Sequence, residues 1–272
     1  MSLLTLEDTE AASRVVIAPE RGAIVKSFTV GARELLYMDE ATFADPTKNV
    51  RGGIPVLFPS PGKLEGDRFE RHGRGGSMKQ HGFARTLPWT VMARELRRTT
   101  LALQANAETR AQYPWDFRAE LVFSLDGACL RITFRLENRD TTDLPFALGY
   151  HPYFLVTEKR GVQIDTRATR AYDNVQKAER RFTGFDLTAP ELDLHLLDHG
   201  SSATALRLAD GTHIALRASN EFGLWVVWTL AGRDFVCVEP WTAPGDALNS
   251  GARLRTVPPG ATSETWFEIA TV

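Results

Sequence analysis

Five ionisable residues of this sequence lie in four segments that contain glycine or proline, where a strand-rich chain must bend, and each segment places one of them directly beside glycine or proline. They are Arg51, His81, Arg85, His151 and Glu239, in the segments RGGIPVLFP, QHGFARTLPW, LGYHPYF and VEPWTAPGDALNSG. Glycine and proline place such polar groups at the ends or edges of a sheet. Histidine and glutamate are the usual side chains for proton transfer, because their pKa values can be tuned close to neutrality. If these side chains converge, they form an acid/base site with arginines that orient a substrate.

His151 has a plainer alternative, because LGYHPYF is otherwise apolar enough to be buried. A neutral imidazole in a core needs only one donor and one acceptor partner, so the residue could be an ordinary core histidine. The residue alone leaves both interpretations open.

Several classes of chemistry and partner are disfavoured. Serine does not occur in a G-x-S-x-G setting, and the sequence has no glycine-rich phosphate loop between a strand and a helix. The chain has 32 basic and 34 acidic residues and a net charge of −2. That balance gives no strong field for a nucleic acid or an anionic membrane. We therefore expect a small-molecule ligand and no nucleic-acid or membrane partner.

The N-terminal stretch MSLLTLEDTEAAS is acidic where a secretory signal is basic, and no apolar run approaches the roughly 18 residues of a membrane span. These features predict a cytoplasmic protein. Cys129 and Cys237 each lie in an apolar, strand-like run without a second cysteine at ligand spacing. We expect both to be inert core thiols.

Short β-rich stretches with period-two alternation recur along the whole chain. They are SRVVIAP, GAIVKSFTVG, WTVMAREL, TLALQAN, RAELVFSL, ACLRITFRLEN, TALRLAD, THIALRAS, LWVVWTL, DFVCVEP and ETWFEIATV. Asp126-Gly127 and Asp210-Gly211 predict tight hairpin turns, because these residues accept positive φ. Helical periodicity is weak, and short helical turns are expected only near Pro190 to Leu197. The pattern predicts an all-β protein of antiparallel sheets, with residues 1–272 in one domain.

The segment from Pro59 to Gln80 interrupts this spacing. It is rich in glycine, proline and charge and shows no apolar face, so it predicts a long surface loop. Because Arg51 precedes the loop and His81 follows it, we expect the loop to border the site. Its basic side chains outnumber its acidic ones and would attract a phosphorylated substrate.

The four segments, in the same order, resemble the signature segments of the aldose 1-epimerase (galactose mutarotase) superfamily. RGGIP and HGFAR are most similar to the hexose-6-phosphate mutarotase branch, whereas GYHPYF and EPWT resemble the general aldose 1-epimerases. The resemblance implies a large antiparallel β-sandwich whose groove binds a pyranose. We expect no cofactor and no metal ion. The resemblance leaves the sugar, its phosphorylation and the oligomeric state open, and a monomer or weak dimer is expected.

The resemblance also implies roles for individual residues. Glu239 would take the proton of the anomeric hydroxyl, and His151 would protonate the ring oxygen. His81 would hold the ring oxygen or a neighbouring hydroxyl, Arg51 would grip the sugar, and Arg85 would supply a second cation for a 6-phosphate.

An acidic residue that binds sugar hydroxyls falls at Asp193 or, alternatively, Asp173. Either aspartate could instead cap a turn.

Two rival functions remain. His81, His151 and Glu239 could ligate a divalent cation in a metal-dependent isomerase, or the fold could bind a carbohydrate without catalysis. The other histidines are expected in solvated turns and loops, and most of the tryptophans in the core; these are His72, His195, His199, His213, Trp225, Trp228 and Trp266. Trp241, two residues after Glu239, is expected to share its face of the strand and to pack beside the sugar.

Overall fold

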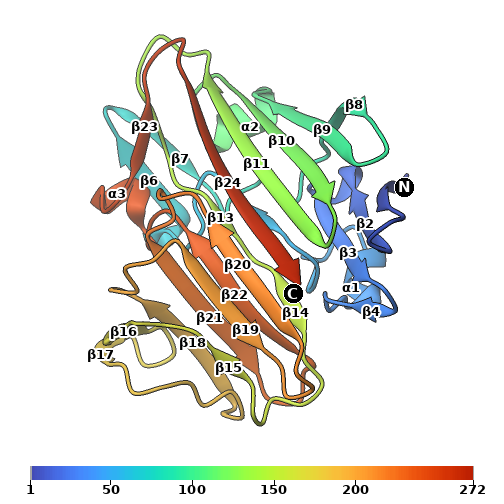
Figure 1. Ribbon diagram of the computed structural model, residues 1–272. Coiled ribbons are helices and arrows are strands. Elements are labelled where there is room, and N and C mark those ends of the chain that lie inside the picture. The colour runs from blue at the N-terminus through green and yellow to red at the C-terminus, as the bar shows by residue number, and fades with distance from the viewer. Residues whose placement is uncertain (1, 272) are drawn as a thin grey trace.

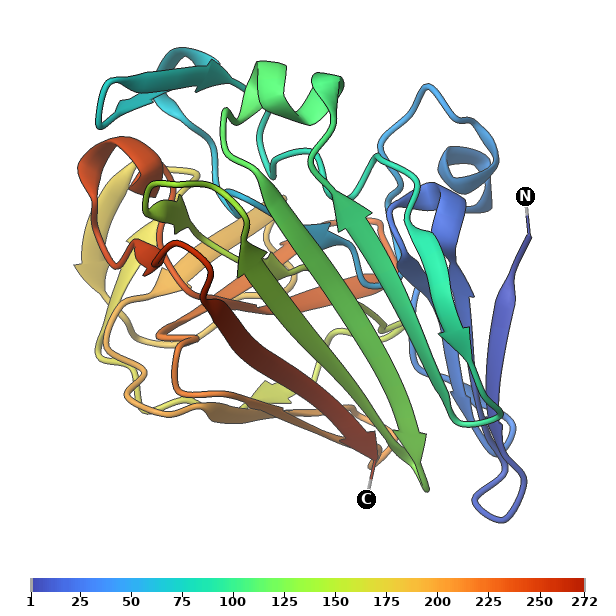
Figure 2. The ribbon, with the colours of Figure 1, turned by 90° about the horizontal axis from the view of Figure 1, so that it is seen from above.

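The computed structural model describes residues 2–271 and is built mainly from antiparallel strands (Figures 1 and 2). One eight-stranded sheet, the β11 sheet, has the order β15 (Gln163–Ile164), β19 (Ala203–Arg207), β20 (His213–Ala218), β24 (Thr262–Thr271), β11 (Cys129–Asn138), β10 (Phe117–Asp126), β9 (Arg98–Gln104) and β8 (Thr90–Arg94). The predicted all-β antiparallel sandwich is confirmed. None of the helices among the described residues is long and apolar enough to span a membrane.

A second sheet, the β22 sheet, has the order β17 (Ala178–Arg181), β16 (Arg170–Asp173), β18 (Glu191–Leu196), β21 (Leu224–Leu230), β22 (Phe235–Trp241), β13 (Gly149–Tyr150) and β5 (Val56–Leu57); β14 (Tyr153–Leu155) also pairs with β22. Helical turns predicted near Pro190–Leu197 are wrong, because ELDLHL alternates with period two and forms β18.

Smaller elements complete the fold. They are a sheet of β1 (Leu4–Asp8), β2 (Ser13–Ala18), β3 (Ile24–Val30) and β4 (Arg33–Glu34), the pair β12 (Leu144–Phe146) and β23 (Arg255–Val257), the hairpin β6 (Arg68–Arg71) and β7 (Arg74–Ser77), the helices α1 (Glu40–Ala44), α2 (Ala107–Gln112) and α3 (Ala247–Ser250), and two short 3-10 turns, η1 (Pro19–Arg21) and η2 (Glu65–Asp67). The four-stranded sheet lies beside the β8–β9 end of the β11 sheet (Figure 2), where the Glu7 backbone N–H donates to the carbonyl of Leu96.

The core lies between the two large sheets because each turns one apolar face inward. On β11 burial alternates strictly, with Leu130, Ile132 and Phe134 inside and Arg131 and Arg135 outside. Val236 and Val238 of β22 belong to the same buried cluster. The predicted hairpins both form, since β10 turns into β11 through Gly127 and Ala128, and β19 into β20 through residues 208–212.

The segment Pro59–Gln80 is more structured than a long surface loop. It contains η2 and the β6–β7 hairpin, and Leu64, Phe69 and Met78 are buried in the main core, so the prediction that it has no apolar face is wrong. The hairpin is held by the Arg74 guanidinium, which donates to both carboxylate oxygens of Asp140 at 2.9 and 3.0 Å. That bidentate pair keeps Arg74 from acting as a free cation.

Candidate active site

His151 lies directly opposite Glu239 because of strand register. Gly149 pairs with Trp241, and Tyr153 pairs with Cys237, so residue 151 falls midway, across from residue 239. Facing residues of antiparallel strands point to the same side of the sheet. The His151 Nδ1 atom accordingly lies 3.4 Å from Glu239 Oε1. The same register brings the acid/base candidates of two distant segments together.

The same register extends across the β22 sheet and defines its second face, which points away from the core and is called here the site face. Its residues in two neighbouring rows are Tyr172, His195, Val226, Glu239 and His151, and Asp193, Trp228, Cys237 and Tyr153. Residues one position along the strands, among them Val238 and Leu194, point to the core. The site face therefore collects the polar and aromatic side chains of the sheet.

Burial controls the proton affinities of the central pair. The side chains of His151 and Glu239 are only 8 and 2% exposed. Burial raises the pKa of Glu239 well above its ordinary value, and the Asp193 carboxylate adds to this, while the indole N–H of Trp241 opposes it by donating to Oε2 at 3.0 Å. Burial, with His81 and Arg85 nearby, lowers the pKa of His151. These shifts favour the neutral acid beside the neutral imidazole.

His151 is not an ordinary core histidine with satisfied nitrogens. Its Nδ1 atom is buried and has no hydrogen-bond partner among residues 2–271. Its ring stacks on Tyr153 at a centroid distance of 4.6 Å and meets the edge of Trp228 at 5.6 Å. Packing thus fixes the ring while leaving the nitrogen available to a proton or a ligand.

His81 comes to the same place from a loop. Its φ is +76°, and Gly82 follows at +67°, where a side chain would collide with the Phe58 carbonyl. The His81 ring lies 5.6 Å from that of His151 and 6.2 Å from Trp241. Burial, and then Arg85, lower the pKa of His81 to about 3. Since Nδ1–H donates to the Pro61 carbonyl, Nε2 remains a bare acceptor.

The two arginines differ in exposure. Arg85 is half-buried, and its Nε has no hydrogen-bond partner within the described part of the chain, while Arg51 is exposed. Burial raises the pKa of the Tyr153 phenol, and both arginines oppose that rise. Their charges therefore act on one side chain of the site face, beside His151.

The two aspartates predicted as alternatives point to opposite faces of the β22 sheet. Asp193 lies on the site face, where Oδ2 accepts from the Asn174 amide at 2.6 Å. Asp173 lies on the core-facing side of β16 and accepts from the backbone N–H groups of Val175 and Gln176 and from Arg180. Asp173 therefore caps the β16–β17 turn.

His195 was missed by sequence reasoning and is buried on the site face. Its Nε2 lies 3.4 Å from Asp193 Oδ1, and its ring lies 5.1 Å from the Trp241 ring. The prediction of a solvated turn histidine is wrong because β18 continues through this position. The alternation in ELDLHL is the signal that could have found it.

Predictions for a tryptophan, a cysteine and a further histidine also need correction. Trp228 is half-buried on the site face rather than in the core, and its indole N–H donates to Glu191 Oε1 at 3.1 Å. Cys129 is half-buried instead of a core thiol, whereas Cys237 is fully buried. His199 is also buried, with its ring nitrogens bonded to Thr166 and the Ala203 carbonyl. Trp225 is in the core as predicted.

The residues that lie close enough together to bind one metal ion differ from His81, His151 and Glu239, the set expected for a metal-dependent isomerase. In the described chain a group of three potential ligands, with ligand atoms within 4.8 Å of one another, consists of His151, Cys237 and Glu239. His81 is not part of that group.

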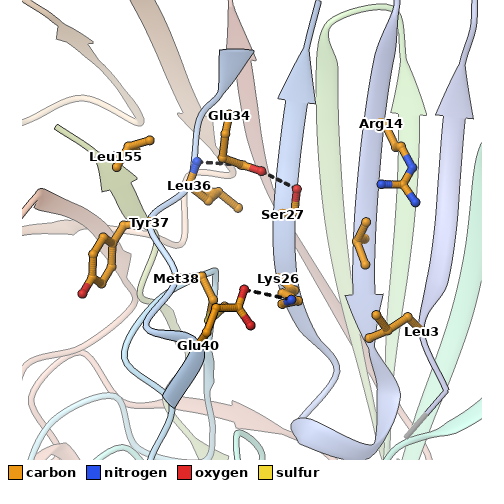
Figure 3. Close-up of a pocket in the computed structure, with 11 residues that line it drawn as sticks. Leu3, Arg14, Lys26, Ser27, Glu34, Leu36, Tyr37, Met38, Glu40 and Leu155 are labelled. Atoms are coloured by element: carbon orange, nitrogen blue, oxygen red, sulfur yellow. Dashed lines mark hydrogen bonds and ion pairs between the residues drawn. The ribbon is translucent and has the colours of Figure 1, made fainter. Parts of the chain in front are cut away.

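A cavity of about 510 Å³ lies away from these residues, between β2–β4 and β14 (Figure 3). Its charged side chains are engaged with neighbours: Lys26 pairs with Glu40 at 2.9 Å, and Glu34 accepts from Ser27 and two backbone N–H groups. The cavity shares no residue with the site face.

Comparison with models of known protein families identifies the family of this chain. The aldose 1-epimerase family model matches residues 2–270, and the chain belongs to that family. The crystal structure of Slr1438 from Synechocystis sp. PCC 6803 is similar with a TM-score of 0.96 and 36% identity, over 99% of this chain and 95% of that one. A galactose mutarotase-like protein from Lactobacillus casei has a TM-score of 0.81 at 22% identity, with 100% of each chain covered. A Cenchrus ciliaris protein named "Putative glucose-6-phosphate 1-epimerase" is 26% identical, over 83% of this chain and 76% of that protein.

Proposed function

We propose that this protein is a mutarotase that interconverts the α and β anomers of a hexose or a hexose 6-phosphate. The observation that carries the proposal is the buried His151–Glu239 pair at 3.4 Å, with an unpartnered imidazole nitrogen, in a chain of the aldose 1-epimerase family. A general base and a general acid at this separation suit a reaction that moves one proton at the anomeric hydroxyl and one at the ring oxygen, because both oxygens are bonded to C1.

The reaction conserves the number of protons on the pair. The Glu239 carboxylate takes the proton of the anomeric hydroxyl while the His151 imidazolium protonates the ring oxygen, and the bond from C1 to the ring oxygen breaks. Ring opening thus converts carboxylate and imidazolium into carboxylic acid and neutral imidazole. Rotation about C1–C2 and the reverse transfers deliver the other anomer.

The electrostatics of the site favour the state that ring opening creates. Burial raises the pKa of Glu239 and lowers that of His151, so the neutral pair is stabilised relative to the charged one. The proton can pass between the two side chains before a cyclic sugar reacts, because they are in contact. This preference supports an open-chain intermediate bound beside the pair.

The remaining side chains suit a polyhydroxylated ring. His81 offers a bare Nε2 acceptor near His151, and Asp193 offers carboxylate oxygens on the same face. Arg85, with its free Nε, and Arg51 supply positive charge beside Tyr153. The arginines, together with the Cenchrus ciliaris relative, support a phosphorylated hexose as one substrate class.

Polarimetry tests the function. Freshly dissolved α-glucose, α-galactose and their 6-phosphates are followed with increasing protein, with and without a chelator. We expect mutarotation to accelerate in proportion to protein, equally in both conditions. A rate equal to that of buffer for every sugar, despite measurable sugar binding, would instead support the non-catalytic carbohydrate-binding function. Loss of activity with chelator would support a metal-dependent isomerase.

A further inference from the structure

Cys237 gives the site a ligand that the acid/base chemistry does not use. Cys237 and Glu239 are two residues apart on β22, so both side chains point to the site face, and His151 stands opposite. Cys237 Sγ, a nitrogen of His151 and a carboxylate oxygen of Glu239 all lie within 4.8 Å of one another. Thiolate, imidazole and carboxylate form a donor set that zinc accepts.

A second observation points to a ligand at this position. The His151 side chain is 8% exposed, and its Nδ1, which lies 3.4 Å from Glu239 Oε1, has no hydrogen-bond partner among the residues that the structure describes. Zinc bond lengths of about 2.0–2.3 Å place tetrahedral ligand atoms roughly 3.5 Å apart. His151 Nδ1 and Glu239 Oε1 are already near that spacing, and the Cys237 sulfur lies within 4.8 Å of a ligand atom of each residue.

We propose that His151, Cys237 and Glu239 form an inhibitory site for a thiophilic divalent cation such as Zn²⁺, Cd²⁺ or Co²⁺. Cys237 and Glu239 each release a proton to water when the metal binds, and the resulting thiolate and carboxylate balance the two positive charges in a buried setting. A solvent molecule or a sugar hydroxyl completes the coordination. Hard cations such as Mg²⁺ are not expected to bind, because a thiolate selects softer ions.

Nearby charges act in opposite directions on a cation at this site. The Asp193 carboxylate acts on both Cys237 and Glu239 and favours a cation, whereas the Arg85 guanidinium acts on His151 and disfavours one. The three ligand groups themselves include two side chains that can become anionic. The site therefore suits a doubly charged ion better than a singly charged one.

The metal-binding test is spectroscopic and independent of catalysis. Chelator-treated wild-type protein is titrated with Co²⁺, and the thiolate-to-cobalt charge-transfer absorption is measured. We expect this absorption to saturate at one Co²⁺ per chain, to disappear when Zn²⁺ is added, and to be unaffected by excess Mg²⁺. A wild-type titration without this absorption overturns the proposal, even if no variant folds.

Two cysteine variants locate the site. Cys237→Ser should lose the charge-transfer absorption and bind Zn²⁺ roughly tenfold or more weakly, whereas Cys129→Ser, which changes the half-buried thiol of β11, should match wild type. Retention of the absorption in Cys237→Ser, or its loss in Cys129→Ser, contradicts the assignment. Cys237→Ala provides the same test if the serine variant does not fold.

The inhibitory consequence rests on the proposed mutarotase function and is measured separately. We expect Zn²⁺ to abolish anomerisation by wild type and to inhibit Cys237→Ser only at concentrations roughly tenfold or more higher. Cobalt binding in a wild-type protein without anomerase activity would refute the proposed function and leave the metal site standing. Equal inhibition of wild type and Cys237→Ser would contradict inhibition through this site.

Discussion

In both large sheets, residues that point to the core alternate with residues that point away from it. The two sheets differ in the surroundings of the second face, which points away from the core. On the β11 sheet the second face is open, and its charged residues pair across strands, as Arg131 does with Glu268 at 2.7 Å and Arg135 with Glu264 at 2.6 Å. On the β22 sheet every residue of β22 is buried, and the second face holds Glu239 and His151 without a pairing cation from a neighbouring strand. The second face of the β22 sheet is buried, whereas that of the β11 sheet is open to solvent. Burial therefore turns the same alternation into a site in which the pKa values of Glu239 and His151 are shifted.

The cysteines repeat this contrast on a smaller scale. Cys129 begins β11 and is half-buried, whereas Cys237 lies inside β22 and is fully buried beside the acid/base pair. Burial raises the pKa of both thiols, and more strongly for Cys237. The two residues are of the same type, so the difference between their pKa values follows from how deeply each side chain is buried.

The largest effect is expected for His151→Phe. Phenylalanine keeps the ring stacked on Tyr153 and removes both nitrogens. General acid/base groups typically contribute ~10²–10⁴-fold in rate, so kcat for anomerisation should fall by about that factor while the protein stays folded. His213→Phe on the β11 sheet is the matched control. Activity near wild type in His151→Phe would contradict the account that the second face of the β22 sheet is catalytic and that of the β11 sheet is not.

Arg85→Ala should act on phosphorylated sugars most. A charge-assisted hydrogen bond contributes roughly 1.5–3 kcal/mol, or about ten- to a hundredfold in affinity. We expect kcat/KM for glucose 6-phosphate to fall by that amount and kcat/KM for glucose to fall less. Equal losses on the two sugars would make Arg85 a general sugar contact or a structural residue and would favour an unphosphorylated substrate.

Strand alternation predicted the antiparallel strands well, because burial of one face leaves a period-two signal that survives in a single sequence, whereas the sandwich architecture came from the family resemblance. The strands β10, β11, β19–β22 and β24 are all in predicted segments. β16 and β18 were missed, because their site-face residues are polar and resemble a turn. The pairing of His151 with Glu239 depends on register between segments 88 residues apart, which residue types alone do not encode; the family resemblance supplied it.

Trp241→Phe should shift a pH profile. The indole N–H lowers the pKa of Glu239 by donating to Oε2 at 3.0 Å, so its removal raises that pKa further. The basic limb of kcat/KM, which reports loss of the last proton from the pair, should then move to higher pH. A neutral hydrogen bond contributes about 1 kcal/mol, so the shift should be below about one pH unit. A basic limb that moves to lower pH would contradict this role.

The smallest effect is expected on the open face of the β11 sheet. Glu264→Gln removes a pair with Arg135 in which both side chains are about half exposed. Exposed ion pairs contribute about 0–1 kcal/mol, so the free energy of unfolding in urea should change by less than that. A loss of several kcal/mol would show that this face is not simply solvated.

The central claim is that the covered face of the β22 sheet catalyses anomerisation through Glu239. The most direct measurement is the exchange rate between α and β anomers at equilibrium, followed by NMR magnetisation transfer for wild type, Glu239→Gln and Glu264→Gln. The same chemical change is thereby made once on each sheet. We predict that Glu239→Gln reduces the catalysed exchange rate by ~10²–10⁴-fold, while Glu264→Gln matches wild type. Exchange at the wild-type rate in folded Glu239→Gln would contradict the account.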